Sequence, residues 1–184
     1  NSVGAKSIKT PGASGGIDPN VGDIRINDIV EVVYDGTNFI LLTAPNLLSY
    51  AHVRNTASTT ASTGAVDMFD EDFFSSYTRA SVTKGITHTA SSGRFALSYG
   101  GSYIITLSAI LSAGSATTAT VSIQRNGSAV SSASFNVNTT GTSVCLTYAA
   151  AEGGGEEYDF VYDADGAVAV QALSGTTVSI VRVG

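Results

Sequence analysis

Hydrophobic and polar residues alternate along much of the second half of this chain. The clearest alternation runs from Gly101 to Ser112. Its apolar members are Tyr103, Ile105, Leu107, Ala109 and Leu111. Successive side chains of a β-strand point to opposite faces, so these residues share one face. We expect that face to belong to the hydrophobic core.

Further short strands are predicted downstream with the same period. Residues 117–125 lead into Asn126-Gly127, a pair that favours a tight hairpin, and a strand follows directly. Strands are then predicted over 142–151, around 158–162 and at the end of the chain, with glycines 153–155 as a turn. Their apolar positions are Ala119, Val121 and Ile123; Ala133, Phe135 and Val137; Val144, Leu146 and Tyr148; Tyr158, Phe160 and Tyr162; and Val178 and Ile180. About eight to ten short strands at this spacing predict an all-β jelly-roll β-sandwich.

The positions that face away from this core differ between strands. Between residues 117 and 137 they are polar, namely Thr120, Ser122, Gln124, Ser132 and Ser134. The strand from Gly101 presents Ile104 and Ile110 instead, and the last strand presents Val181 and Val183. A sheet that is apolar on both faces needs a second burial partner. Because no helix is predicted, we expect that partner to be another copy of the chain.

Cys145 is the only cysteine, which excludes an intramolecular disulfide and any metal site of several cysteines. A lone cysteine is more often a small buried hydrophobe than a reactive thiol, so we expect it to be buried. We place it in the contact between copies. The predicted interface comprises Ile104, Ile110, Cys145, Val181 and Val183.

The first half of the chain predicts a smaller unit. Residues 1–22 are rich in Gly, Ser and Pro and predict an irregular or partner-dependent lead-in, whereas two β-rich runs flank Asp35-Gly36 and predict a hairpin. A lone hairpin is marginal in water and needs neighbours. Proline at Ala44-Pro45-Asn46 marks a boundary, so residues 1–46 are predicted as a neck or shaft segment and 47–184 as the head. Within the head, 58–64 and Asp67–Tyr77 predict a long surface excursion.

Composition narrows the class of protein. Charged residues make up 13% of the 184 residues and the formal net charge is −6, with nine scattered basic residues. This balance argues against a nucleic-acid partner and is typical of extracellular or virion β modules. No apolar run approaches the ~20 residues of a membrane helix and no signal peptide precedes the fold, so no membrane insertion is expected. Because the chain starts at Asn1, we expect a fragment or a processed product.

The head resembles a known family, the globular head of complement's first component and the tumour-necrosis-factor jelly roll. The landmarks cover roughly residues 78–184 and are Gly93-Arg94-Phe95, Gly101-Ser102-Tyr103, Val121-Ser122-Ile123-Gln124-Arg125-Asn126-Gly127, Gly154-Gly155-Glu156-Glu157-Tyr158 and Thr177-Val178-Ser179-Ile180-Val181-Arg182. The resemblance implies a homotrimer whose inner sheet includes the strands over 101–112, 142–151 and the chain end. Glu156-Glu157 departs from the family's Gly-Asp, which puts no fold feature in doubt but implies a different basal turn.

A second resemblance concerns residues 28–42, DIVEVVYDGTNFILL. This stretch looks like one that recurs after shaft sequence in bacteriophage fibre and adhesin proteins. It implies a bacteriophage tail or head fibre, an extracellular place on the virion, and contact with other virion proteins through the N-terminal side. A short β unit that is poorly buried alone can complete its core with two other copies.

No catalytic constellation is predicted. Nucleophilic catalysis needs a base beside a serine or cysteine, and neither His52 nor His88 lies near a nucleophile-elbow sequence. We expect His88 to be a solvated loop histidine, and His52 faces either solvent or a neighbouring copy. The carboxylates that could serve glycoside hydrolysis are Asp67, Asp70, Glu71 and Asp72. Charged residues in a loop usually keep it solvated, so no enzyme is predicted.

No cofactor is predicted, and calcium is the one candidate ion. Ca²⁺ takes several oxygen ligands, and Asp163 with Asp165, or Asp70 with Asp72, are the only clusters. No complete Ca²⁺-loop pattern is present, so the stretch YDADG is interpreted as a turn.

The predicted function is attachment. With both ends of the head at the shaft side, the connections 112–116, 138–142 and 163–175 reach the far tip, and the Asp67–Tyr77 stretch either joins them or covers the side. The candidate contacts to a host-surface glycan or protein are Asn138, Thr140, Asp163, Asp165, Asp70, Asp72 and Tyr77. The alternative is a structural head fibre or capsid decoration without a required receptor. Sequence does not separate the two.

Overall fold

The computed structural model describes residues 6–9, 30–42, 49–71, 77–79 and 85–183. The chain forms two compact units, Asn1–Leu47 and Leu48–Gly184. The predicted boundary after Asn46 falls among residues 43–48, outside the described ones. Among the described residues, no helix has the length and apolar character to cross a membrane.

The first unit contains a three-stranded sheet in the order β1-β3-β2. Its strands are β1 (Ile8–Lys9), β2 (Val32–Tyr34) and β3 (Phe39–Leu41). The predicted hairpin is confirmed: β2 and β3 are antiparallel, and Asp35 Oδ1 accepts hydrogen bonds of 2.7 Å from the amides of Thr37 and Asn38. The prediction of an irregular lead-in is wrong at residues 8–9, which pair in parallel with β3. A two-residue strand shows no period in the sequence.

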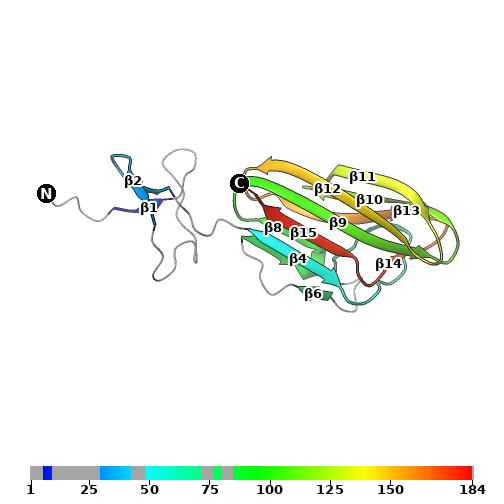
Figure 1. Ribbon diagram of the computed structural model, residues 1–184. Helices are drawn as coiled ribbons and strands as arrows, with labels where there is room; N and C mark the ends of the chain where they lie inside the picture. Colours follow the sequence, from blue (N-terminus) through cyan, green and yellow to red (C-terminus); the bar gives the residue numbers. More distant parts are fainter. Residues whose placement is uncertain (1–5, 10–29, 43–48, 72–76, 80–84, 184) are drawn as a thin grey trace. The chain divides into compact units, whose positions relative to one another are not determined.

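The second unit, the head, is a β-sandwich of two six-stranded sheets (Figure 1). The β10 sheet runs β11-β10-β13-β8-β7 with β5 paired to β13; its strands are β5 (Gly64–Asp67), β7 (Ile86–Thr89), β8 (Arg94–Leu97), β10 (Thr117–Arg125), β11 (Ser128–Val137) and β13 (Glu157–Ala164). The β9 sheet runs β12-β9-β15-β4-β6 with β14 paired to β9; its strands are β4 (Tyr50–Asn55), β6 (Tyr77–Arg79), β9 (Gly101–Ala113), β12 (Thr142–Glu152), β14 (Val170–Ala172) and β15 (Thr177–Arg182). A single 3-10 turn, η1 (Ala90–Ser92), links β7 to β8.

The core lies between the sheets and uses the predicted phases. The apolar face of β9 is buried along its whole length, and Tyr158, Phe160 and Tyr162 of β13 face it with no exposed surface. Phe160 also packs edge-on against Phe69 and Phe95, with ring centroids 5.7 and 5.4 Å apart. Such aromatic contacts add to the burial of apolar surface that stabilises the fold.

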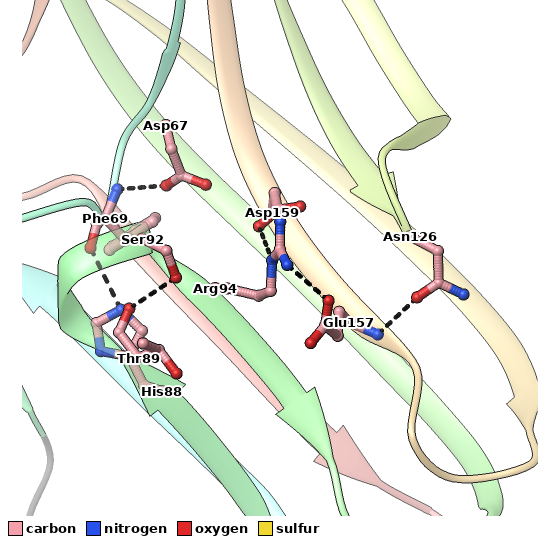
Figure 2. Close-up of polar contacts among 9 residues, drawn as sticks. All are labelled: Asp67, Phe69, His88, Thr89, Ser92, Arg94, Asn126, Glu157 and Asp159. Atoms are coloured by element: carbon pink, nitrogen blue, oxygen red, sulfur yellow. Dashed lines mark hydrogen bonds and ion pairs between the residues drawn. The ribbon is translucent and has the colours of Figure 1, made fainter.

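The predicted hairpin at Asn126-Gly127 is confirmed. Both residues have positive φ, 48° and 77°, as a two-residue primed turn requires. Asn126 Oδ1 also accepts a hydrogen bond of 2.9 Å from the Glu157 amide, so this turn is tied to the start of β13 (Figure 2). A register shift between Ile123 and Gln124 places a bulge in β11 opposite the end of β10.

Two predictions about the upstream part of the head are wrong. The Asp67–Tyr77 stretch does not start as a surface excursion, because Asp67 ends β5 and the next two residues, Met68 and Phe69, are buried in the core. His88 is not a solvated loop residue: it is 6% exposed on β7 and stacks on Phe95 with centroids 4.3 Å apart. Both strands have only four residues, too few for an alternation to stand out from Thr and Ala neighbours.

The head has two distinct ends. Both ends of its chain lie at one of them, the terminal end, where the amide of Arg182 donates to the Ser49 carbonyl and that of Val183 to Ser102. The opposite end, the loop end, carries the connections 56–63, 114–116, 138–141 and 165–176. Within the head, the predicted grouping of the chain ends at one end and of these connections at the other is therefore confirmed, although Asp163 and Ala164 still belong to β13 and the last connection contains β14.

Candidate functional site

The loop end brings together three of the predicted receptor-binding residues, Asn138, Thr140 and Asp165. The amide of Ala113 donates to the Asn138 carbonyl at 3.2 Å, which joins the end of β9 to the turn before β12. Asp165 accepts a hydrogen bond of 2.9 Å from the Thr117 hydroxyl at the start of β10. The three connections therefore form one continuous surface.

Asn138 shapes the turn in which it lies. Its Oδ1 accepts hydrogen bonds from the amide and the hydroxyl of Thr140, at 3.1 and 3.0 Å. Gly141 follows with φ of 104°, a conformation that glycine adopts without strain. Asn138 thus holds Thr139 and Thr140 in an exposed position, and its own carboxamide oxygen is engaged within the loop.

The two aspartates of YDADG have different roles. Asp165 Oδ1 also accepts a hydrogen bond of 3.1 Å from the Ala167 amide, so the predicted turn is confirmed, and these bonds from Ala167 and Thr117 lower the pKa of Asp165. Asp163 is exposed on the outward face of β13, opposite Ala65. In the described part of the chain, no three acidic, histidine or cysteine side chains gather where they could hold a metal ion.

The other predicted contacts lie elsewhere or are not described. Asp70 follows β5 and lies beside η1, where the Glu71 amide donates to the Ala90 carbonyl at 2.8 Å. The backbone of Tyr77 pairs with Asn55 on the edge strand β6. Asp72 lies outside the described residues. The predicted set therefore divides between the loop end and the side of the head.

The outward face of the β9 sheet holds the predicted contact between copies. Cross-strand rows over β12, β9, β15 and β4 are Ala149–Ile104–Val181–Tyr50, Thr147–Thr106–Ser179–His52 and Cys145–Ser108–Thr177–Arg54. None of the outward side chains of β12, β9 and β15 is charged, and charge begins only at β4. The central part of this face is therefore uncharged and built from small side chains.

The exposure of the predicted interface residues is uneven. Ile104, Val181 and Val183 are 41%, 36% and 58% exposed, while Ile110 is half-buried. Cys145 is exposed, so its predicted burial is wrong for the single chain. The face is also less apolar than predicted, since Ser, Thr and Ala separate the larger side chains.

A second uncharged surface, which the sequence analysis missed, lies along one flank of the head. β11 and β12 are each an edge strand of one of the two sheets, and residues 128–151 contain no charged residue and no proline. The partly buried side chains packed against the core lie mostly on these two strands; they are Val130, Ala133, Phe135, Val144 and Tyr148. Natural proteins usually guard exposed edges with charge or proline. The absence of charged residues over these 24 positions is the sequence feature that could have predicted this surface.

The β10 sheet, in contrast, carries a charged cluster on its outward face (Figure 2). Arg94 of β8 reaches two carboxylates of β13, with Nε 3.2 Å from Asp159 Oδ1 and Nη1 2.7 Å from Glu157 Oε2. Hydrogen bonds to both carboxylates raise the pKa of Arg94, that to Asp159 most. Asp67 of β5 lies at the same corner, and burial raises the pKa of its carboxyl to about 8.

A buried polar group closes the terminal end of the core. Glu152 Oε1 accepts a hydrogen bond of 2.5 Å from the Tyr158 hydroxyl, and Glu152 Oε2 lies 2.7 Å from Arg125 Nη2. Burial, and then this hydrogen bond to a carboxylate, raise the pKa of Tyr158. Glu156, one of the two residues that depart from the family pattern, lies at the same end. Its Oε1 accepts a hydrogen bond of 3.2 Å from the Gly153 amide.

Comparison with solved structures shows which fold this is. Eiger TNF from S. frugiperda is similar with a TM-score of 0.53 at 12% identity, over 74% of this chain and 93% of that chain. Murine APRIL at pH 5.0 is similar with a TM-score of 0.55 at 13% identity, over 74% and 99%. Neither a protein-family model nor a curated protein sequence matches the chain. The likeness shows the fold alone, the tumour-necrosis-factor-like jelly-roll β-sandwich predicted from the sequence.

Proposed function

We propose that this chain is the homotrimeric head of a virion fibre, most simply a bacteriophage fibre, that attaches to a host-surface glycan or protein through its loop end. The observation that carries the proposal is the pair of uncharged surfaces on one head, the outward face of the β9 sheet and the flank of β11 and β12. The phage assignment is supported by the resemblance of residues 28–42 to fibre proteins.

The two uncharged surfaces support a closed ring of copies. The outward face of the β9 sheet is broad, whereas the flank is a narrow edge with partly exposed core side chains. The face of one copy therefore fits the flank of another copy better than it fits a second face. A contact between two different surfaces of one chain is heterologous and forms a ring when the rotation closes. Packing the flank of each copy on the face of the next buries Ile104, Val181 and Cys145, and three copies complete the ring.

The first unit supports the same assembly. Its small sheet leaves much of its apolar surface exposed; the residues are Ile8, Val32, Val33, Tyr34 and Leu42. A sheet of this size cannot bury enough surface alone. Two further copies would cover these side chains, and the N-terminal side would then face the rest of the virion.

The loop end supports recognition by hydrogen bonds. The exposed Thr139 and Thr140, on one turn, and the exposed Ser115, on a neighbouring turn, present hydroxyl groups. None of the described residues in the four connections is aromatic or cationic, so this end offers no aromatic platform for stacking and no cation for a nucleic-acid backbone. We therefore propose a binding role without catalysis, outside the cell.

A structural head fibre or capsid decoration is the second candidate. The internal use of Asn138 and Asp165 favours it, because their acceptor oxygens already serve the turns. In that case the loop end has no receptor, and the trimer alone is the function.

An attachment assay with the full chain separates the two. Thr140→Arg is expected to abolish binding to host cells without changing the trimer seen by sedimentation. Thr87→Arg, at an exposed position of β7, is the matched control and should bind normally. Unchanged binding by Thr140→Arg and by a second loop-end variant, Ser115→Arg, would leave the structural role as the better account.

A further inference from the structure

A confined carboxyl lies at the corner where β5 meets η1 and β13. Asp67 Oδ1 accepts a hydrogen bond of 2.8 Å from the Phe69 amide, while Oδ2 is shielded from solvent and has no hydrogen-bond partner among the described residues. Gly93 closes the site, since a Cβ there would lie 2.2 Å from Asp67 Oδ1 and 2.8 Å from the Asp70 nitrogen. The close approach of Gly93 to the Asp67 carboxyl therefore leaves no space for a side chain at position 93.

The charges around this carboxyl do not neutralise it. Asp159 of β13 and Asp70, just after β5, are both acidic neighbours. Arg94 of β8 is directed to Asp159 and Glu157, and no ion pair joins a cation to Asp67 among the described residues (Figure 2). His88 of β7 is stacked on Phe95 with its Nε2 3.3 Å from the Phe69 carbonyl.

We propose that this corner is an acid-stabilised latch, in which protonated Asp67 holds β5 against η1 and β13, and ionised Asp67 loosens them. A buried charge without a partner is costly, whereas a neutral carboxyl is tolerated. The parts that the latch holds together are connected by two backbone bonds of 2.8 Å, from the Met68 amide to the Phe160 carbonyl and from Glu71 to Ala90.

The direction of the pH dependence follows from the proton. Burial, opposed by backbone hydrogen bonding from Phe69 and Phe160 and reinforced by the charges of Asp159 and Asp70, raises the pKa of Asp67 from 3.8 to about 8. Between these values the folded chain keeps a proton that the unfolded chain releases. The contribution of Asp67 to stability is therefore fully present below pH 3.8 and is lost as the pH rises to about 8.

Thermal unfolding of the full chain at several pH values tests the latch. Asp67→Asn keeps an acceptor for the Phe69 amide and cannot ionise. From about pH 5 to about pH 9, the midpoint of the natural chain is expected to fall at least about 4 °C more than that of Asp67→Asn. Asp163→Asn, at an exposed position of β13, is the control and should keep the slope of the natural chain. Equal slopes for the natural chain and Asp67→Asn would overturn the proposal.

A direct titration does not depend on any variant. The side-chain carboxyl carbon of Asp67 can be followed by NMR in the folded natural protein as the pH is raised. A midpoint near 8 is expected, and a midpoint near the ordinary value of 3.8 would refute the latch.

Discussion

The outward faces of the two sheets differ although their inward faces are alike. Both sheets turn apolar side chains into the same core. On its outward face the β10 sheet carries Arg94, which pairs with both Glu157 and Asp159, and the hydroxyls of Thr120 and Ser134, which lie 2.6 Å apart. On its outward face the β9 sheet carries no charged side chain over β12, β9 and β15 and leaves Ile104 and Val181 exposed.

This difference indicates which sheet face suits the proposed contact between copies and which contributes only to the stability of each copy. Polar groups that already have partners within the chain gain little from a second molecule, so the outward face of the β10 sheet suits solvent. Uncharged groups without large polar neighbours lose little when they leave water. Substitutions on the outward face of the β9 sheet should therefore change the proposed assembly, and those on the outward face of the β10 sheet should change only the folding of each copy.

The largest effect is expected from a charge on the uncharged face. Ile104→Arg places a guanidinium at the proposed contact, where it would be buried without a partner. We expect the apparent dissociation constant of the trimer, measured by sedimentation equilibrium, to rise by at least about 100-fold. Thr87→Arg on the other sheet is the control and should leave the trimer unchanged. A trimer that persists in Ile104→Arg would remove this face from the interface.

A smaller effect is expected where the two sheets meet at the terminal end. Glu152→Ala leaves the buried Tyr158 hydroxyl without its acceptor, which should lower the free energy of unfolding by about 1–3 kcal/mol in urea titrations. Adding Tyr158→Phe removes the stranded hydroxyl and should recover part of the loss. If the double variant is no more stable than Glu152→Ala, the hydrogen bond is not the cause.

The hairpin of the β10 sheet should respond to two substitutions by different amounts. Asn126→Ala loses both the tolerance of positive φ and the acceptor for the Glu157 amide, and should cost about 1–2 kcal/mol of unfolding free energy. Asn126→Gly keeps the turn and should cost roughly half of that. Equal losses, measured by urea titration of both variants, would show that only the side-chain bond matters. Neither variant should alter the sedimentation of the trimer.

The smallest effect is expected at the outward charges of the β10 sheet. Arg94→Met removes the ion pairs with Glu157 and Asp159 and keeps the apolar part of the side chain. Because Arg94 is 44% exposed, the loss should not exceed about 0.5 kcal/mol and should shrink at high salt. A larger loss that salt does not change would mean that Asp159 is stranded without a counter-charge.

The long strands were predicted well from the sequence because period two is clear over nine or more residues. β10 begins and ends where it was predicted, and β9 extends only one residue further. The short strands β5, β7 and β14 were missed, since three or four residues with Thr, Ala or Gln carry no distinct alternation. Their pairing with the long strands supplies the hydrogen bonds that local sequence does not demand.

The candidate sites divide in the same way. Asn138, Thr140 and Asp165 were found because turn residues between long strands must lie at the ends of the sandwich. The Asp67 corner was missed because it joins segments far apart in the chain. The flank was missed for another reason: β11 and β12 are consecutive strands, and only the fold makes both of them edge strands on one side of the core. Asp67 meets Gly93 and Asp159, and β11 meets β12 across the edge of the core.

By itself the sequence determined the all-β class, the phase of each long strand and the hairpin at Asn126-Gly127, because these depend on neighbours two residues apart and on local backbone preferences. Only the tertiary structure decided that His88 is buried, that the Asp67 carboxyl is confined and that Cys145 is exposed. Those outcomes depend on which surface of a distant strand covers the residue. Burial and pKa depend on these residues that are distant in the sequence, and the hydrophobic period along the chain does not report them.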